Sequence, residues 1–155
     1  MIILGIDPGL ANTGYGLIKK LKVFKCLDYG VIKTSQNSNR GERLRKINNE
    51  LSKIAKKYRP DILAIENVYF FKNLKTAIPV SQVEGVILLM ATKKRLPIWE
   101  ATPLQVKLAI TGDGKADKIV VQKKIKKLLS LKKIPKPDDA ADALAIALTC
   151  FLKKT

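Results

Sequence analysis

Histidine is absent from this chain of 155 residues, and that absence removes several kinds of chemistry. Without imidazole there is no histidine general base, no Ser-His-Asp triad and no histidine-ligated zinc. Hydrolytic chemistry would have to depend on carboxylates, lysines or a bound metal ion. Acidic residues are also scarce, because 13 Asp and Glu stand against 30 Lys and Arg, giving a formal net charge of +17. This excess favours a polyanionic partner such as nucleic acid.

A large positive charge is also found in lysine-rich proteins of heat-adapted organisms and in proteins that bind a membrane surface. A heat-adapted protein usually balances its lysines with glutamates, and here glutamates are few. No apolar run approaches the ~20 residues that cross a bilayer, and the start MIILGID leads directly into a strand. We therefore expect a cytoplasmic protein with no membrane partner.

Cysteine is rare as well, with Cys26 and Cys150 as its two representatives. Both lie in apolar stretches without metal-ligand spacing, which indicates small core residues in a reducing compartment. No linker or internal repeat divides the chain, and its length suits one domain covering residues 1–155.

The hydrophobic pattern predicts strands first and then helices that alternate with strands. Strands are expected at 2–6, in two antiparallel segments between 14 and 33, at 61–66 and at 96–99. Helices are expected at 41–58, at about 75–95, from Thr102-Pro103, in a lysine-rich segment with Val121, Ile125, Leu128 and Leu129 on its inner face, and at 138–152. This order is typical of an α/β fold with a mixed sheet and helices on both faces.

Acidic residues stand at the ends of three of these segments. Asp7 and Glu66 each end an apolar strand, so they would meet at one edge of the sheet if the strands are neighbours. Asp139 and Asp142 are three residues apart and share one face of the last helix, as Asp138 does with Asp142. Each has an ordinary alternative, since Asp7 suits a turn, Glu66 a strand end and Asp139 a helix cap.

Asp142 is the hardest of these acids to explain as ordinary structure. It lies in an alanine-rich helix that looks fully buried and that contains no arginine to pair with it. Oxygen ligands from three elements suit Mg²⁺, with Mn²⁺ as an alternative, and two such ions ~4 Å apart activate water against a phosphodiester.

Aromatic and basic residues accompany the predicted acidic site. Tyr69 and Phe70, beside Lys72, follow Glu66 directly and could stack on unpaired bases, or fold back into the core. Lys107, Lys115 and Lys118 surround a glycine turn, where as a group they could contact phosphates, although any one of them could be a solvated surface lysine.

Four segments together resemble the RuvC-type Holliday junction resolvases. They are ILGIDPGLANTGYG, AIENVYFFKN, ATPLQVK followed by TGDGKADK, and DDAADALAIAL, in the same order and at similar spacing over roughly residues 2–150. The resemblance implies a ribonuclease H-like fold and a Mg²⁺-dependent homodimer. The dimer would nick two strands of a four-way DNA junction symmetrically and leave 5′-phosphate and 3′-hydroxyl ends. It would work on its own or with a motor complex that drives branch migration.

The same resemblance assigns roles to individual residues. The catalytic and metal-binding carboxylates would be Asp7, Glu66, Asp139 and Asp142, because the D-A-A-D spacing selects Asp139 over Asp138. Tyr69 falls where the family usually has a base-contacting phenylalanine, and Lys107 and Lys118 match lysines that support phosphate binding. The helix around 83–90 offers more than one apolar face, so it is either the dimer interface or a core helix.

Three other functions compete with this interpretation. An actin-like ATPase would need a second domain, for which 155 residues leave no room. A basic nucleic-acid-binding module without catalysis would not need an intact acidic set. A ribonuclease H-like nuclease that cuts hybrids or other branched DNA stays open.

Overall fold

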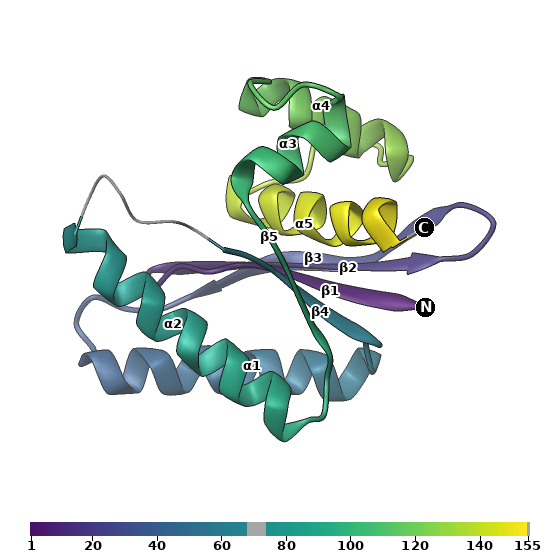
Figure 1. Ribbon diagram of the computed structural model, residues 1–155. Coiled ribbons are helices and arrows are strands. Elements are labelled where there is room, and N and C mark those ends of the chain that lie inside the picture. Colours follow the sequence, from purple (N-terminus) through teal and green to yellow (C-terminus); the bar gives the residue numbers. More distant parts are fainter. Residues whose placement is uncertain (68–73, 155) are drawn as a thin grey trace.

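A computed structural model describes residues 1–67 and 74–154 of the chain. Its strands form one sheet in the order β3-β2-β1-β4-β5 (Figure 1). Their bounds are β1 (Ile2–Asp7), β2 (Asn12–Lys20), β3 (Phe24–Lys33), β4 (Ile62–Glu66) and β5 (Ile98–Ala101). The first three strands are antiparallel hairpins, and β4 and β5 run parallel to β1. The sheet is therefore mixed, as predicted.

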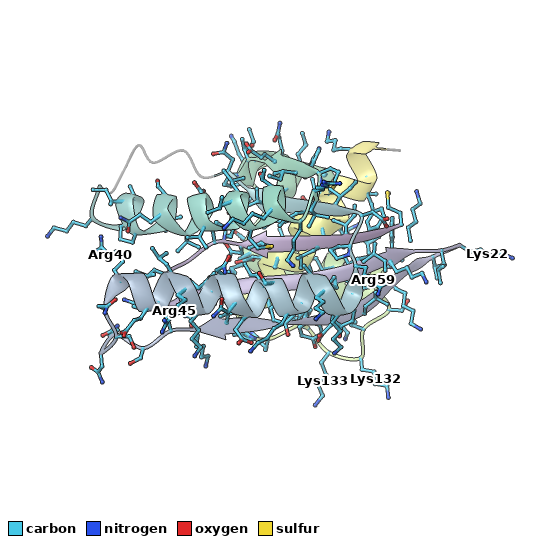
Figure 2. The ribbon with its side chains drawn as sticks, turned by 90° about the horizontal axis from the view of Figure 1, so that it is seen from below. Lys22, Arg40, Arg45, Arg59, Lys132 and Lys133 are labelled. Atoms are coloured by element: carbon cyan, nitrogen blue, oxygen red, sulfur yellow. The ribbon has the colours of Figure 1, made fainter. Side chains whose placement is uncertain are left out.

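Helices cover both faces of this sheet. They are α1 (Arg40–Tyr58), α2 (Leu74–Lys93), α3 (Pro103–Thr111), α4 (Lys118–Leu128) and α5 (Asp138–Lys154). In Figure 1, α1 and α2 lie below the sheet, α5 lies directly above it, and α3 and α4 form a further layer over α5. Figure 2 shows α1 from below, with the exposed Arg45 on its outer side, while Arg40 at its start donates to Gln82 of α2 at 3.4 Å. The predicted architecture is confirmed.

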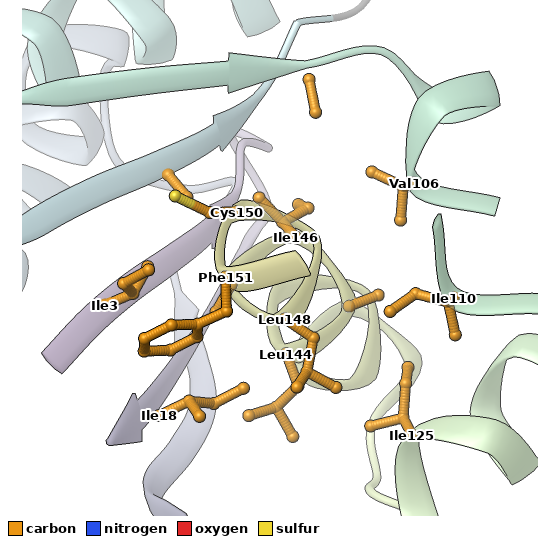
Figure 3. Close-up of a cluster of buried hydrophobic side chains, with 14 of the residues drawn as sticks. Ile3, Ile18, Val106, Ile110, Ile125, Leu144, Ile146, Leu148, Cys150 and Phe151 are labelled. Atoms are coloured by element: carbon orange, nitrogen blue, oxygen red, sulfur yellow. The ribbon is translucent and has the colours of Figure 1, made fainter. Parts of the chain in front are cut away.

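The strands contribute side chains to two hydrophobic cores, one on each face of the sheet. Ile3 and Ile18 point to the α5 side, where they pack with Leu144, Cys150 and Phe151 (Figure 3). Residues of the opposite parity point to α1 and α2, among them Leu4, Ile6 and Leu17 with Ile47 and Leu51. Successive strand side chains face opposite sides of a sheet, so one apolar run supplies both cores.

Two glycines allow α5 to approach the sheet closely. A Cβ on Gly5 would overlap the carbonyl oxygen of Ala143, and a Cβ on Gly14 would overlap that of Asp139. Gly14 is the β2 partner of Asp7 in the antiparallel register. The start of α5 is therefore held against the end of β1.

Local capping signals agree with the predicted helix starts. Asn39 caps α1 and Thr102 caps α3, each through a reciprocal capping box, and Pro103 is the first residue of α3. Val121 and Ile125 on the inner face of α4 are buried as predicted, and so is Leu129, which caps the end of this helix. Leu128 was expected there too, but it is 36% exposed, because it lies one residue before the buried Leu129 and so turns away from the core.

Of the cysteines, Cys150 is buried and Cys26 is half-buried, and neither forms a disulfide. Within residues 1–67 and 74–154, no helix is long and apolar enough to span a membrane.

Candidate active site

Asp7 and Glu66 lie side by side at one edge of the sheet. Strands β1 and β4 are parallel, and Ile6 is paired with Ile65 in their register. The next residue on each strand is the acidic one, so both carboxylates emerge at the carboxyl ends of neighbouring strands. Open α/β sheets commonly place ligands at this edge.

Helix α5 adds two further acids to the same edge. Asp139 packs its backbone against Gly14, which is the cross-strand partner of Asp7. Asp142 follows one turn later on the same face of α5. Acidic residues from β1, β4 and α5 therefore meet at one place, although up to 135 residues separate them along the chain.

Electrostatics confirms that these acids influence one another. Burial, together with the charges of Glu66, Asp142 and Asp139, raises the pKa of Asp7 to about 8. Burial, followed by the charge of Asp142, raises the pKa of Glu66 to about 7. The pKa of Asp142 is also raised by burial, while Lys118 opposes the shift. A cluster of buried acids with raised pKa values is a common property of functional sites.

Lys118 is the basic partner at this cluster. Its Nζ donates to Oδ2 of Asp142 at 2.8 Å and lies 3.7 Å from Oδ2 of Asp138. The expectation that Asp142 would be fully buried is wrong, since its side chain is 33% exposed. Helix α5 contains no arginine, as the sequence indicates, but Lys118 pairs with Asp142 from another helix. The partner comes from α4 and not from α5 itself, so the sequence of α5 alone could not indicate it.

Asp138 belongs to a separate anchor beside the cluster. Its Oδ1 accepts from Nε2 of Gln122 at 3.1 Å and from Nζ of Lys136 at 2.9 Å. The hydrogen bonds from Lys136 and Gln122 lower the pKa of Asp138, so this carboxylate stays ionised. Its other oxygen is the one that faces Lys118.

A pocket of about 230 Å³ opens beside the acids. Its polar lining consists of Glu66, Asp142, Lys107 and Lys118, and its apolar lining comes from α3, α4 and α5. The structure thus brings Lys107 and Lys118 to the acids, as the sequence suggested. Lys115 does not line this pocket, and its side chain is exposed in the turn between α3 and α4. Tyr69, Phe70 and Lys72 lie outside the described residues.

Comparison with known proteins identifies the family. A profile of the family described as crossover junction endodeoxyribonuclease RuvC matches residues 3–150. The chain belongs to the RuvC family. The crossover junction endodeoxyribonuclease RuvC of Caldicellulosiruptor saccharolyticus is 50% identical to it, over 100% of this chain and 95% of the relative. The protein of the same name from Petrotoga mobilis is 51% identical, over 95% of this chain and 91% of the relative.

Solved structures agree with this assignment. Thermus thermophilus RuvC in complex with a Holliday junction substrate has a TM-score of 0.92 to this chain at 30% identity, covering 99% of this chain and 95% of the other. The ribonuclease H-like fold that the sequence predicted is that of the RuvC family.

The acidic set of this RuvC chain fits a divalent cation in chemistry and charge. Carboxylate oxygens are the ligands that Mg²⁺ and Mn²⁺ prefer, and mutually repelling acids are stabilised by a cation. In the side-chain positions described for residues 1–67 and 74–154, however, no three acidic or cysteine side chains converge as a ready-made ligand set. Lys118 holds one oxygen of Asp142 in these positions.

Sequence reasoning missed three contributors to this site. Gly14 lies in β2 and makes room for the backbone of Asp139, a role that no local sequence pattern indicates. Gln122 and Lys136 were not singled out, although both fix Asp138. One signal was available, because Gln122 is a polar residue that follows Lys118 at a spacing of four and interrupts the buried face of α4.

Proposed function

We propose that this chain is a metal-dependent endonuclease that resolves four-way DNA junctions by paired symmetric nicks. One observation carries the proposal, namely the parallel register that sets Asp7 beside Glu66 where α5 brings Asp139 and Asp142. In this proposal these four residues are the catalytic acids and hold Mg²⁺, two ions per site, with Mn²⁺ as the alternative. When bound, the ions would activate water and stabilise the leaving oxygen.

The chain's own residues would supply position and charge. Asp7 and Glu66 are fixed by neighbouring strands, which hold a site more firmly than loops do. Lys107 and Lys118 line the pocket beside the acids and would bind the phosphate that is cut. Apolar side chains line part of this pocket, which would accept the sugar next to the phosphate that is cut and would limit the access of water.

The distribution of charge supports a DNA substrate. Residues 118–137 contain eight lysines and no acid. This segment begins at the active site with Lys118 and continues along α4 to Lys132 and Lys133, which project into solvent in Figure 2. Such a surface binds phosphates without reading sequence. Lys115 would extend it, and Tyr69, Phe70 and Lys72 remain predicted base and backbone contacts.

Symmetric cutting requires two sites, and α2 offers the surface for a homodimer. Its inner side is core, because Val83, Ile87 and Met90 are buried. Its outer side exposes Ile78 by 60% and Leu89 by 55%, two large apolar side chains that a dimer contact would bury. The inner side therefore supports a core role for this helix, and the outer side supports a role as the dimer interface. A two-fold dimer would match the approximate symmetry of a junction. Action with a branch-migration motor complex and a cytoplasmic location stay predictions, as does the single domain covering 1–155.

The proposal is tested by substrate choice. The protein is offered matched four-way, three-way, linear and RNA–DNA hybrid substrates with Mg²⁺, and the initial rates are compared. We expect the four-way junction to be cut at least tenfold faster than the others, in two strands at symmetric positions. Faster cutting of the hybrid would instead assign the chain to a ribonuclease H activity, and binding without any cutting would make it a DNA-binding module.

A further inference from the structure

The two oxygens of Asp138 have different surroundings. Oδ1 is fixed by Gln122 at 3.1 Å and by Lys136 at 2.9 Å. Gln122 is 3% exposed, so this anchor belongs to the buried face of α4. Among residues 1–67 and 74–154, Oδ2 accepts no hydrogen bond of this kind, and it faces Nζ of Lys118 at 3.7 Å. The carboxylate is therefore held from one side and presented to Lys118 from the other.

Lys118 lies between two carboxylates and contacts one of them more closely than the other. It donates to Asp142 at 2.8 Å and lies farther from Asp138, at 3.7 Å. Under the proposed function, Asp142 would help to hold a divalent cation, and Lys118 now occupies one of its two oxygens. Two positive charges on one carboxylate repel each other, so a bound metal ion should weaken the contact between Lys118 and Asp142.

We propose that Asp138 is a positioning residue that receives the ammonium group of Lys118 when a divalent cation takes Asp142. The transfer needs only a small rotation of the lysine side chain, because both oxygens already lie within 4.0 Å of its Nζ. The transfer keeps Lys118 at the mouth of the pocket, within reach of a phosphate. Without Asp138 to receive it, the lysine would move into solvent. This inference rests on the proposed function and explains why the acid next to the D-A-A-D motif is anchored by Gln122 and Lys136.

Metal affinity should therefore depend on Asp138. Without the carboxylate of Asp138, Lys118 can neutralise only Asp142, so it competes more strongly with the metal. Asp138→Asn should therefore weaken Mn²⁺ binding to the DNA-free protein roughly three- to tenfold. In a Lys118→Met background no lysine competes, and the same Asp138→Asn change should have less than a twofold effect.

The experiment measures Mn²⁺ affinity by paramagnetic resonance for the wild type, both single variants and the double variant, without DNA. Asp117→Asn is the matched control, since Asp117 is an exposed acid next to Lys118 whose side chain makes no capping hydrogen bond. It loses the same charge and should leave the Mn²⁺ affinity within twofold of wild type. Gln122→Met, which loosens Asp138 but keeps its charge, should weaken Mn²⁺ binding in the same direction as Asp138→Asn.

Several outcomes would overturn the inference. An equal loss of affinity from Asp138→Asn in both backgrounds would show that Asp138 acts as a plain charge or as a ligand. An unchanged affinity in folded Asp138→Asn, with the fold checked by thermal unfolding, would show that the pair has no role. A wild-type protein that binds no Mn²⁺ would instead contradict the proposed function, together with the inference that rests on it.

Discussion

Asp7 combines deep burial with acidic neighbours, and this makes the metal-free protein sensitive to pH. Its pKa is raised from 3.8 to about 8, and that of Glu66 from 4.5 to about 7. The folded state therefore holds these protons more tightly than the unfolded chain does. In such a case the stabilisation is complete at low pH, and the free energy of unfolding falls as the pH rises from about 4 to about 8.

Asp7→Asn should remove much of this pH dependence. In EDTA at pH 8.5 the variant should be more stable than the wild type, by at least about 3 °C in midpoint temperature, the shift that about 1 kcal/mol produces in a domain of this size. At pH 4 the difference should shrink, because Asp7 is then protonated in the wild type as well. Asp117→Asn serves as the control and should follow the wild-type curve. Thermal unfolding that finds Asp7→Asn less stable than wild type at pH 8.5 would contradict the account.

Individual residues show which parts of the site could be predicted from the sequence and which could not. Asp7 and Glu66 were predictable because each ends an apolar strand, and β1 and β4 proved to be neighbours. The pairing of Lys118 with Asp142 was not predictable, since it joins α4 to α5 across 24 positions. Side-chain pairs between helices depend on how the helices pack, and hydrophobic periodicity carries no information about that packing.

At the scale of elements, the site depends on how closely α5 lies on the sheet. Gly14→Ala would place a methyl group against the backbone of Asp139, which cannot yield as a flexible side chain could. We expect the free energy of unfolding to fall by roughly 1–3 kcal/mol, as overpacked cores do. Cleavage should fall further than stability accounts for, because α5 would carry Asp139 and Asp142 away from Asp7.

Gly41→Ala is the control for this change. Gly41 lies at the exposed start of α1, and a Cβ there would make only an ordinary contact with Asn39, at 3.4 Å. Its stability should be unchanged or slightly higher, because alanine favours helix over glycine. Chemical denaturation of both variants, with cleavage measured where each is fully folded, checks the prediction. A Gly14→Ala variant as stable and active as Gly41→Ala would show that close packing of α5 is not needed.

The elements themselves were largely predictable, and their mutual approach was not. Short apolar runs predicted the strands, the period of its apolar residues predicted α1, and the cap at Thr102 predicted the start of α3. The role of Gly14 depends on a helix more than 120 residues later in the chain, so local pattern could not indicate it. Leu128 shows the same limit, since its exposure is decided by the edge of the α4 packing surface.

For the whole molecule, the proposed dimer depends on the exposed side of α2. Leu89→Glu puts a charge on the proposed dimer surface, where burial of an unpaired carboxylate is costly. Sedimentation at micromolar concentration should find wild type dimeric and this variant monomeric. Leu104→Glu is the matched control, because Leu104 is a leucine of similar exposure, 62%, on α3. Loss of the dimer in both variants, or in neither, would contradict the assignment of α2 as the interface.

The acids from β1, β4 and α5 are proposed to form one metal-dependent site that cuts junctions. The most direct measurement compares junction binding and junction cleavage by wild type and Asp7→Asn. Binding in Ca²⁺ or EDTA should be near wild type, since Asp7 would hold a metal ion and not the DNA. Cleavage with Mg²⁺ should fall at least about 100-fold. A variant that binds normally and still nicks within a few-fold of the wild-type rate would contradict the account.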